Sequence, residues 1–151
     1  MILWTRIFTP DELTAHGTDS AAGYLRIAFT AIGPDWVEAT MPLDARTTDS
    51  SGALAGGGMS ILAETVASVA TTMTLDMRTR HCVGQLLTVR HVNAVTAGPV
   101  TARASLLYVT EQNQCWQVKI CDAHGDLACV AEMTMVLLDG PPKQRPQSPL
   151  A

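Results

Sequence analysis

The sequence has few aromatic and few charged residues, and neither kind is gathered into a run. Aromatic residues make up 5% of the chain and charged residues 16%, and the net charge is −4. The Lys and Arg residues are scattered along the chain, which excludes the continuous basic face typical of nucleic-acid-binding proteins. We therefore expect no nucleic-acid partner.

Closely spaced cysteine pairs are absent. The four cysteines lie at positions 82, 115, 121 and 129 and form no CxxC motif. This spacing does not predict a metal site, and three of the four fall in segments that have the pattern of strands. We expect small buried thiols in a reducing compartment, and no metal.

We also expect neither a signal peptide nor a membrane span from this sequence. The first ten residues are too short for a signal peptide and do not have its pattern. The longest apolar stretch, 56–75, contains Glu64, three glycines and several hydroxyl side chains, which favours a soluble core helix over a transmembrane one. The prediction is a cytoplasmic protein that does not associate with membranes.

The 151 residues, 47% of them hydrophobic, are enough for one domain with one substantial core. Periodicity and turn signals predict a short helix over 9–17, two strands over 23–32 and 36–43, a long helix over 56–75, and four strands over 82–92, 100–109, 115–121 and 128–138. The helix has little polar surface, so we expect an α+β fold in which an antiparallel sheet wraps it and the last four strands form a meander. A Pro-rich tail is expected over 139–151.

Glu64 is the one charged residue between Asp49 and Asp76. The surrounding segment predicts a buried helix, where an unpaired carboxylate costs several kcal/mol. Such a carboxylate has to be hydrogen-bonded, protonated or used in chemistry. Burial would raise its pKa toward the range in which a carboxylate acts as a base near neutral pH.

A run of three glycines opens that helix. The amino end of a helix presents unpaired N–H groups and a partial positive charge, and Gly56 and Gly57 allow a ligand oxygen to approach them closely. These amides lie about two helical turns before Glu64. An oxyanion site and a carboxylate on one helix indicate acyl chemistry.

The order of elements, with a glycine-started helix that carries one carboxylate, resembles the hotdog fold. The detail is similar to acyl-CoA thioesterases of the phenylacetate-degradation and 4-hydroxybenzoyl-CoA type, and most of all to 1,4-dihydroxy-2-naphthoyl-CoA thioesterase-like proteins. The matching positions include Glu38-Ala39-Thr40-Met41-Pro42, Arg46-Thr47, Gly56-Gly57, Leu62-Ala63-Glu64, Val83-Gly84 and His91. The resemblance covers residues 1–138, which we treat as one domain.

The resemblance implies hydrolysis of an acyl-CoA thioester to the free acid and CoA. Glu64 takes the place of the family's nucleophile or general base, and the Gly56 amide, with that of Gly57, takes the place of the oxyanion donor. Ser68, one turn after the carboxylate, fits a residue that holds water or substrate. No cofactor is implied, since CoA is part of the substrate. The family's sites lie at the interface of a homodimer, and we expect a homotetramer built from two such dimers.

Three positions depart from the family pattern. Ala55 stands where relatives have a histidine, Asp49 stands where they have a glutamine near the thioester carbonyl, and Thr110-Glu111-Gln112 lacks the arginine of a CoA-contacting turn. Loss of the histidine leaves an alternative open, a non-catalytic hotdog module that binds an acyl thioester or fatty acyl ligand. A hydratase of the same fold is disfavoured, because it would need that histidine.

Substrate contacts are expected from residues outside the central helix as well. Relatives keep a histidine near the path of CoA at the position of His91, and Arg90 beside it is a candidate phosphate contact. Asp49 is a further candidate near the thioester. The remaining histidines, His16, His81 and His124, have the pattern of loop residues.

The small face of the helix predicts close approach of a sheet or of another copy of the helix. Its members are Ala63, Ala67, Ala70 and Thr71.

Overall fold

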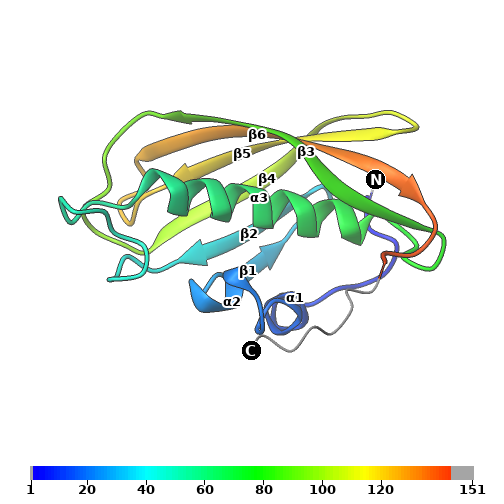
Figure 1. The fold of residues 1–151 in the computed structure, drawn as a ribbon, viewed down its shortest axis with the longest axis horizontal. Coiled ribbons are helices and arrows are strands. Elements are labelled where there is room, and N and C mark those ends of the chain that lie inside the picture. Colours follow the sequence, from blue (N-terminus) through cyan, green and yellow to red (C-terminus); the bar gives the residue numbers. More distant parts are fainter. Residues whose placement is uncertain (1, 144–151) are drawn as a thin grey trace.

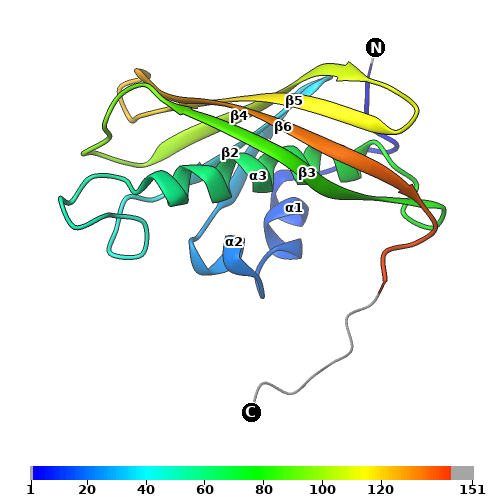
Figure 2. The same ribbon diagram turned by 45° about the horizontal axis from the view of Figure 1, so that its top comes forward.

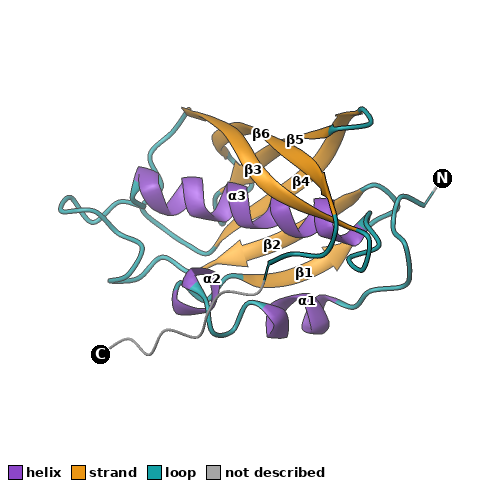
Figure 3. Ribbon diagram, turned by 45° about the vertical axis from the view of Figure 1, so that its right-hand side comes forward, coloured by secondary structure: helices purple, strands orange, loops and turns teal. Residues whose placement is uncertain are grey.

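The computed structural model describes residues 2–143, which form one antiparallel sheet curved around a long helix (Figures 1 and 2). The helices are α1 (Pro10–His16), α2 (Ala21–Tyr24) and α3 (Gly56–Met73). The strands are β1 (Ala28–Ile32), β2 (Trp36–Met41), β3 (Arg80–His91), β4 (Val100–Val109), β5 (Asn113–Cys121) and β6 (Leu127–Asp139). Helix α3 lies against the concave face of the sheet, and α1 and α2 lie beside β1 at one edge (Figure 3). The predicted α+β hotdog architecture is therefore confirmed.

Helix α3 is held to the sheet by two kinds of side chain. The first kind is long and apolar: Met59 is 4% exposed, and Leu62 and Val66 are fully buried. The small residues Ala63, Ala67, Ala70 and Thr71 are also fully buried. Of the two partners expected for this small face, a sheet or another copy of the helix, the chain's own sheet is the one that covers it.

The sheet order differs from the predicted meander of four strands. The observed order is β1-β2-β4-β5-β6-β3, so the meander consists only of β4, β5 and β6. Strand β4 pairs with β2, which precedes the helix in sequence, and β3 pairs with β6 at the far edge. The 92–99 connection makes this crossing past the start of α3, where Val95 is 1% exposed and its carbonyl accepts a hydrogen bond from the Leu54 amide at 2.8 Å.

The predicted strand over 23–32 begins too early. Helix α2 and a turn occupy residues up to 27, and Arg26 has a φ of 55°. Leu25 and Ile27 are 7% and 4% exposed, so their burial satisfies a strand pattern and a helix-to-turn path equally well. Residue alternation alone could not separate the two.

The amino-terminal segment seals one end of the core. The Trp4 ring stacks on Trp116 with 6.2 Å between ring centroids, and the Thr5 amide donates to the Met73 carbonyl at 2.9 Å. Trp116 is fully buried, and its indole N–H donates to the Thr71 hydroxyl at 2.8 Å. Residues 4–5 are thereby fixed beside the carboxyl end of α3, where Thr5 lines a cavity.

The chain reaches the end of β6 at Asp139, so the predicted tail starts one residue inside the sheet. Most of that predicted segment, 144–151, lies outside the described residues. Among residues 2–143, the helices are too short or too polar to cross a membrane.

Candidate active site

A cavity of about 400 Å³ opens at the amino end of α3, and it brings together three of the predicted site residues. Asp49 comes from the loop before the helix, Gly56 from the first turn of α3, and His91 from the last position of β3. The other lining residues are Ser51, Ala53, Leu54, Met59, Val92, Asn93 and Ala94. We call this space the amino-end cavity.

Gly56 and His91 are in direct contact within the amino-end cavity. A Cβ atom at Gly56 would lie 3.1 Å from Nε2 and 3.2 Å from Cε1 of His91. Ala55 occupies the N-cap and its side chain can accept no hydrogen bond, so the first amides of α3 have no side-chain cap. Glycine at position 56 thus allows an imidazole to lie against the open, electropositive end of the helix.

Asp49 is a fixed and charged member of the amino-end cavity. Its Oδ1 accepts hydrogen bonds from the Ser51 hydroxyl at 2.6 Å and the Ser51 amide at 2.8 Å. These bonds, the side-chain one first, lower the pKa of Asp49. Ser51 is a site residue that the sequence analysis missed, although an Asp followed two residues later by Ser is a turn signal.

Glu64 is exposed in the single chain, so the prediction of a buried carboxylate is wrong for one copy. The sheet covers only part of α3 and leaves a face with Gly57, Ile61 and Glu64 open. The carboxylate lies against β3, because a Cβ at Gly84 would be 3.1 Å from Glu64 Oε1 and 2.5 Å from Met133 Cε. A β-bulge between Gly84 and Leu86 marks the same point of the strand.

Gly56 and Glu64 do not share a cavity in one chain. Eight residues of helix separate them, which corresponds to about 12 Å along the axis. Glu64 does not line the amino-end cavity. A carbonyl held at Gly56 is therefore out of reach of Glu64 of the same chain, since reacting atoms have to come within about 3–3.5 Å.

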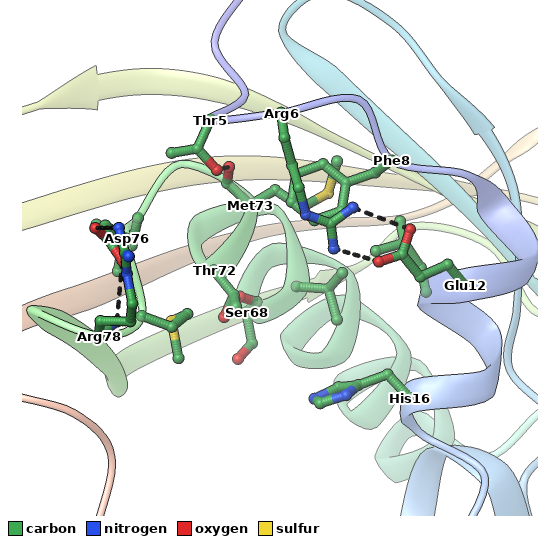
Figure 4. A pocket seen from close by; sticks show the side chains of 14 residues that line it. Thr5, Arg6, Phe8, Glu12, His16, Ser68, Thr72, Met73, Asp76 and Arg78 are labelled. Carbon is green, nitrogen blue, oxygen red and sulfur yellow. Dashed lines mark hydrogen bonds and ion pairs between the residues drawn. The ribbon is translucent and has the colours of Figure 1, made fainter.

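Ser68 lines a second and larger space, the Ser68 cavity, of about 810 Å³ (Figure 4). Its walls are the carboxyl half of α3, helix α1, the segment before α1 and the loop after α3. Its lining residues are Thr5, Arg6, Phe8, Glu12, Leu13, His16, Ser68, Val69, Thr72, Met73, Leu75, Asp76, Met77 and Arg78. This volume fits a small organic group.

Two arginine–carboxylate pairs stand at opposite sides of the Ser68 cavity (Figure 4). Arg6 donates to both carboxylate oxygens of Glu12, and Arg78 donates to both oxygens of Asp76 at 3.0 and 2.8 Å. Hydrogen bonding within each pair lowers the pKa of the acid and raises that of the arginine, and brings Asp76 to about 2. All four groups are therefore charged at neutral pH.

His16 faces this cavity from the last turn of α1, and Figure 4 shows its ring directed toward α3. The expectation that His16 and His81 lie in loops is wrong, because His81 belongs to β3. His124 lies in the turn between β5 and β6, as expected. Sequence patterns gave no signal for Arg6 or Glu12, because their role depends on how the amino-terminal segment folds back.

Two further predicted residues, Arg90 and Gly57, line neither cavity. Arg90 alternates with His91 on β3 and pairs in register with Val130 of β6, so it lies on the opposite face of the sheet from the amino-end cavity. Gly57 is exposed, and a Cβ there would meet no described atom within 4 Å. Gly57 therefore leaves room for a partner or ligand beside the first turn of α3.

The chain is similar to known proteins in family, sequence and fold. Residues 51–129 match the family model described as thioesterase superfamily. The chain is 35% identical over 137 residues to the 1,4-dihydroxy-2-naphthoyl-CoA hydrolase of Escherichia coli K12, covering 91% of this chain and 100% of that protein. It is also 35% identical over 138 residues to the proofreading thioesterase EntH of Cronobacter sakazakii, with 91% and 99% covered.

Solved structures agree with these relatives. A thioesterase from Haemophilus influenzae superposes with a TM-score of 0.88 at 36% identity, covering 91% of this chain and 96% of that one. A mutant thioesterase from Pseudomonas aeruginosa gives a TM-score of 0.89 at 29% identity, with 91% and 99% covered. The chain therefore belongs to the thioesterase superfamily and is a thioester hydrolase with the hotdog fold.

Proposed function

We propose that the protein hydrolyses an acyl-CoA thioester at sites that two copies of the chain build together. One copy contributes the amino-end cavity with Gly56, and its partner contributes Glu64. The observation that carries this proposal is the spacing of about 12 Å along α3, which separates the oxyanion donor from the carboxylate within one chain. The CoA carrier is supported by the name of the Escherichia coli relative.

The free surfaces of the chain support such a dimer. Strand β3 forms one edge of the sheet over twelve residues, and its Val83 and Leu86 side chains are 44% and 57% exposed. Two β3 edges can pair antiparallel about a two-fold axis. An axis near Ser60, midway between Gly56 and Glu64, would place each glycine opposite the partner's carboxylate. The open face of α3, with Gly57 and Ile61, would then lie between the two helices.

The amino-end cavity supplies the oxyanion donors in this proposal. An amide nitrogen lies about 2.5 Å from the Cβ position of its own residue, so His91 Nε2 is within about 5.6 Å of the Gly56 nitrogen. One oxygen can accept from two donors at that spacing, because each N–H···O bond spans about 2.9 Å. His91 then provides an N–H beside the Gly56 amide and compensates for the histidine that Ala55 replaces.

Glu64 acts on the carbonyl carbon that these donors polarise. As a general base it takes a proton from water while the water oxygen bonds to that carbon; as a nucleophile its own oxygen forms the bond, and water later cleaves the anhydride. In both routes the C–S bond breaks, CoA leaves as a thiol after protonation, and negative charge on the carbonyl oxygen is stabilised at the helix end. Water is the only co-reactant, so no cofactor takes part.

The acyl group would extend from Glu64 past Ser68 into the Ser68 cavity of the same chain, because Ser68 lies one helical turn after Glu64. Asp49 borders the thioester at the amino-end cavity of the other chain. Arg90, on the outer face of the sheet, would have to meet CoA phosphates outside both cavities. A homodimer is the minimum assembly, and we extend the proposal to a cytoplasmic homotetramer of two dimers.

Mixed dimers test whether sites are shared between chains. Glu64→Ala removes the carboxylate, and Gly56→Pro removes the donor amide while a proline in the first turn remains compatible with a helix. Each variant alone should lose about 10²–10³-fold or more in kcat. A co-expressed, doubly tagged heterodimer should regain activity, because one of its two sites is then intact.

The control is each tagged variant paired with itself, which should stay inactive. A heterodimer as inactive as these controls would show that each site lies within one chain. Full activity of folded Glu64→Ala alone would remove the catalytic assignment of Glu64. Absence of hydrolysis by the natural protein would leave the non-catalytic binding module as the better description.

A further inference from the structure

The Ser68 cavity combines an apolar interior with a polar rim on one side. Leu13 is 7% exposed and Met73 1% exposed, and with Val69 they give the cavity an apolar wall. On the side of α1 the cavity is lined by polar side chains, those of Arg6, Glu12 and His16. Figure 4 shows these three side chains gathered at the edge away from Asp76 and Arg78. We call Arg6, Glu12 and His16 the α1 rim.

The α1 rim carries a positive charge that is already balanced. The Arg6 guanidinium donates to both Glu12 oxygens and, at 3.0 Å, to the Ile7 carbonyl, and it stacks 3.8 Å from the centroid of the Phe8 ring. These bonds use three of the five N–H groups of a guanidinium, and the Glu12 charge neutralises Arg6, so the pair offers no net positive charge to another anion. Glu12 keeps lone pairs that can accept a further hydrogen bond, and the His16 ring can donate or accept.

We infer that the α1 rim selects acyl groups whose far end is neutral and forms hydrogen bonds, such as a hydroxyl, over both alkyl and carboxylate ends. This inference rests on the proposed function, in which the acyl group occupies the Ser68 cavity. A hydroxyl can donate to Glu12 or exchange hydrogen bonds with His16. A methyl end would remove water from these groups and offer no replacement. A carboxylate end would meet the Glu12 charge while Arg6 is already engaged.

The opposite pair does not provide the same selection. The Arg78 side chain is 88% exposed, compared with 54% for Arg6, so Arg78 projects mostly into solvent. Salt and water weaken an interaction between such a group and a ligand end. Selection of the acyl group by its terminal group therefore takes place at the α1 rim.

A matched substrate panel tests this inference. Short to medium straight-chain acyl-CoAs with methyl, hydroxyl or carboxyl ends are compared by kcat/KM with the full-length protein. At the best chain length, the hydroxyl end should exceed the methyl end by about threefold to tenfold, the effect of one net hydrogen bond. The carboxyl end should be the poorest of the three.

Glu12→Gln makes the test specific to the rim, because it frees Arg6 and removes the opposing charge. The ratio of carboxyl-ended to hydroxyl-ended kcat/KM should then rise by about twofold to fivefold, the range for partly exposed charge pairs. Asp11→Asn is the matched control, since it removes the same charge from the same turn of α1 at a residue that does not line the cavity. Its ratio should equal that of the natural protein.

The outcomes separate the inference from the proposed function. If Glu12→Gln hydrolyses the panel with an unchanged ratio of carboxyl-ended to hydroxyl-ended kcat/KM, the inference about the α1 rim is overturned. The thioesterase proposal stays intact in that case. If the same ratio shifts in Asp76→Asn but not in Glu12→Gln, the acyl end lies at the other side of the cavity. This result would also overturn the inference about the α1 rim. Absence of hydrolysis for every thioester would overturn both.

Discussion

Gly56 and His91 are thirty-five positions apart in sequence, yet their contact shapes the amino-end cavity. Sequence reasoning could find Gly56 from the glycine run and Glu64 from its isolation among apolar residues. It could not find the contact between His91 and Gly56, which depends on the register of β3 against β6 and on the crossing connection that follows. The exposure of Glu64 was missed for a related reason, because an apolar helix segment does not show which side its own sheet leaves open.

Ala55 has no side-chain donor at the amino end of α3, and His91 is proposed to supply one. This proposal gives a testable prediction. If His91 is the second oxyanion donor, His91→Ala should lower kcat by about 10²–10³-fold with a smaller change in KM. Adding Ala55→His to that variant should restore much of the lost kcat, because an imidazole returns to the helix end. Steady-state kinetics on one good acyl-CoA measures both effects.

The rescue separates catalysis from a role in holding CoA. If His91→Ala raises KM while kcat stays unchanged, His91 contacts the CoA moiety only. Circular dichroism of all three variants controls for folding. A double variant no faster than His91→Ala would mean that the site is arranged around other residues.

Among the elements, long and strongly periodic segments were predicted well and junctions were not. The starts of α3 and β4 follow from the glycine run and from Gly98-Pro99. The segment 23–27 was misassigned because Leu25 and Ile27 are buried from a helix and turn as they would be from a strand. The place of β3 at the sheet edge could not be predicted, because local pattern carries no information on which strand lies beside which.

One buried hydrogen bond connects α3 to β5, and its contribution to stability can be tested separately. Thr71→Val keeps the shape of the side chain but leaves the buried Trp116 indole N–H without its acceptor. The free energy of unfolding should fall by about 1–3 kcal/mol. Urea unfolding at a fixed protein concentration measures it.

A second substitution checks that the hydrogen bond is the cause. In a Trp116→Phe background the indole N–H is gone, so Thr71→Val should cost clearly less than in the natural protein. An equal cost in both backgrounds would assign the effect to packing around residue 71 instead.

At the scale of the whole molecule, the open face of α3 predicts how copies assemble. Ile61→Asp would place a charge at the proposed two-fold axis, next to Glu64. The dimer should dissociate and thioesterase activity should fall with it, because each site needs two chains. Sedimentation velocity at several concentrations, with activity measured on the same samples, tests the prediction.

Leu107→Asp is the matched control, since Leu107 is an exposed apolar residue (48%) on β4, away from α3. It should leave the dimer and its activity in place. An Ile61→Asp protein that remains an active dimer would show that the chains associate through another surface.

The edge strand β3 has a consequence for the fate of a chain that has not met its partner. The strand has twelve residues without a proline and carries exposed Val83 and Leu86. Within residues 2–143 no other strand pairs with its outer side. An exposed edge strand can pair with a strand of another chain, and such pairing is a route to aggregation. Pairing of β3 with its own copy would therefore protect the chain from misassociation, and newly made subunits would stay soluble only if they meet faster than they aggregate.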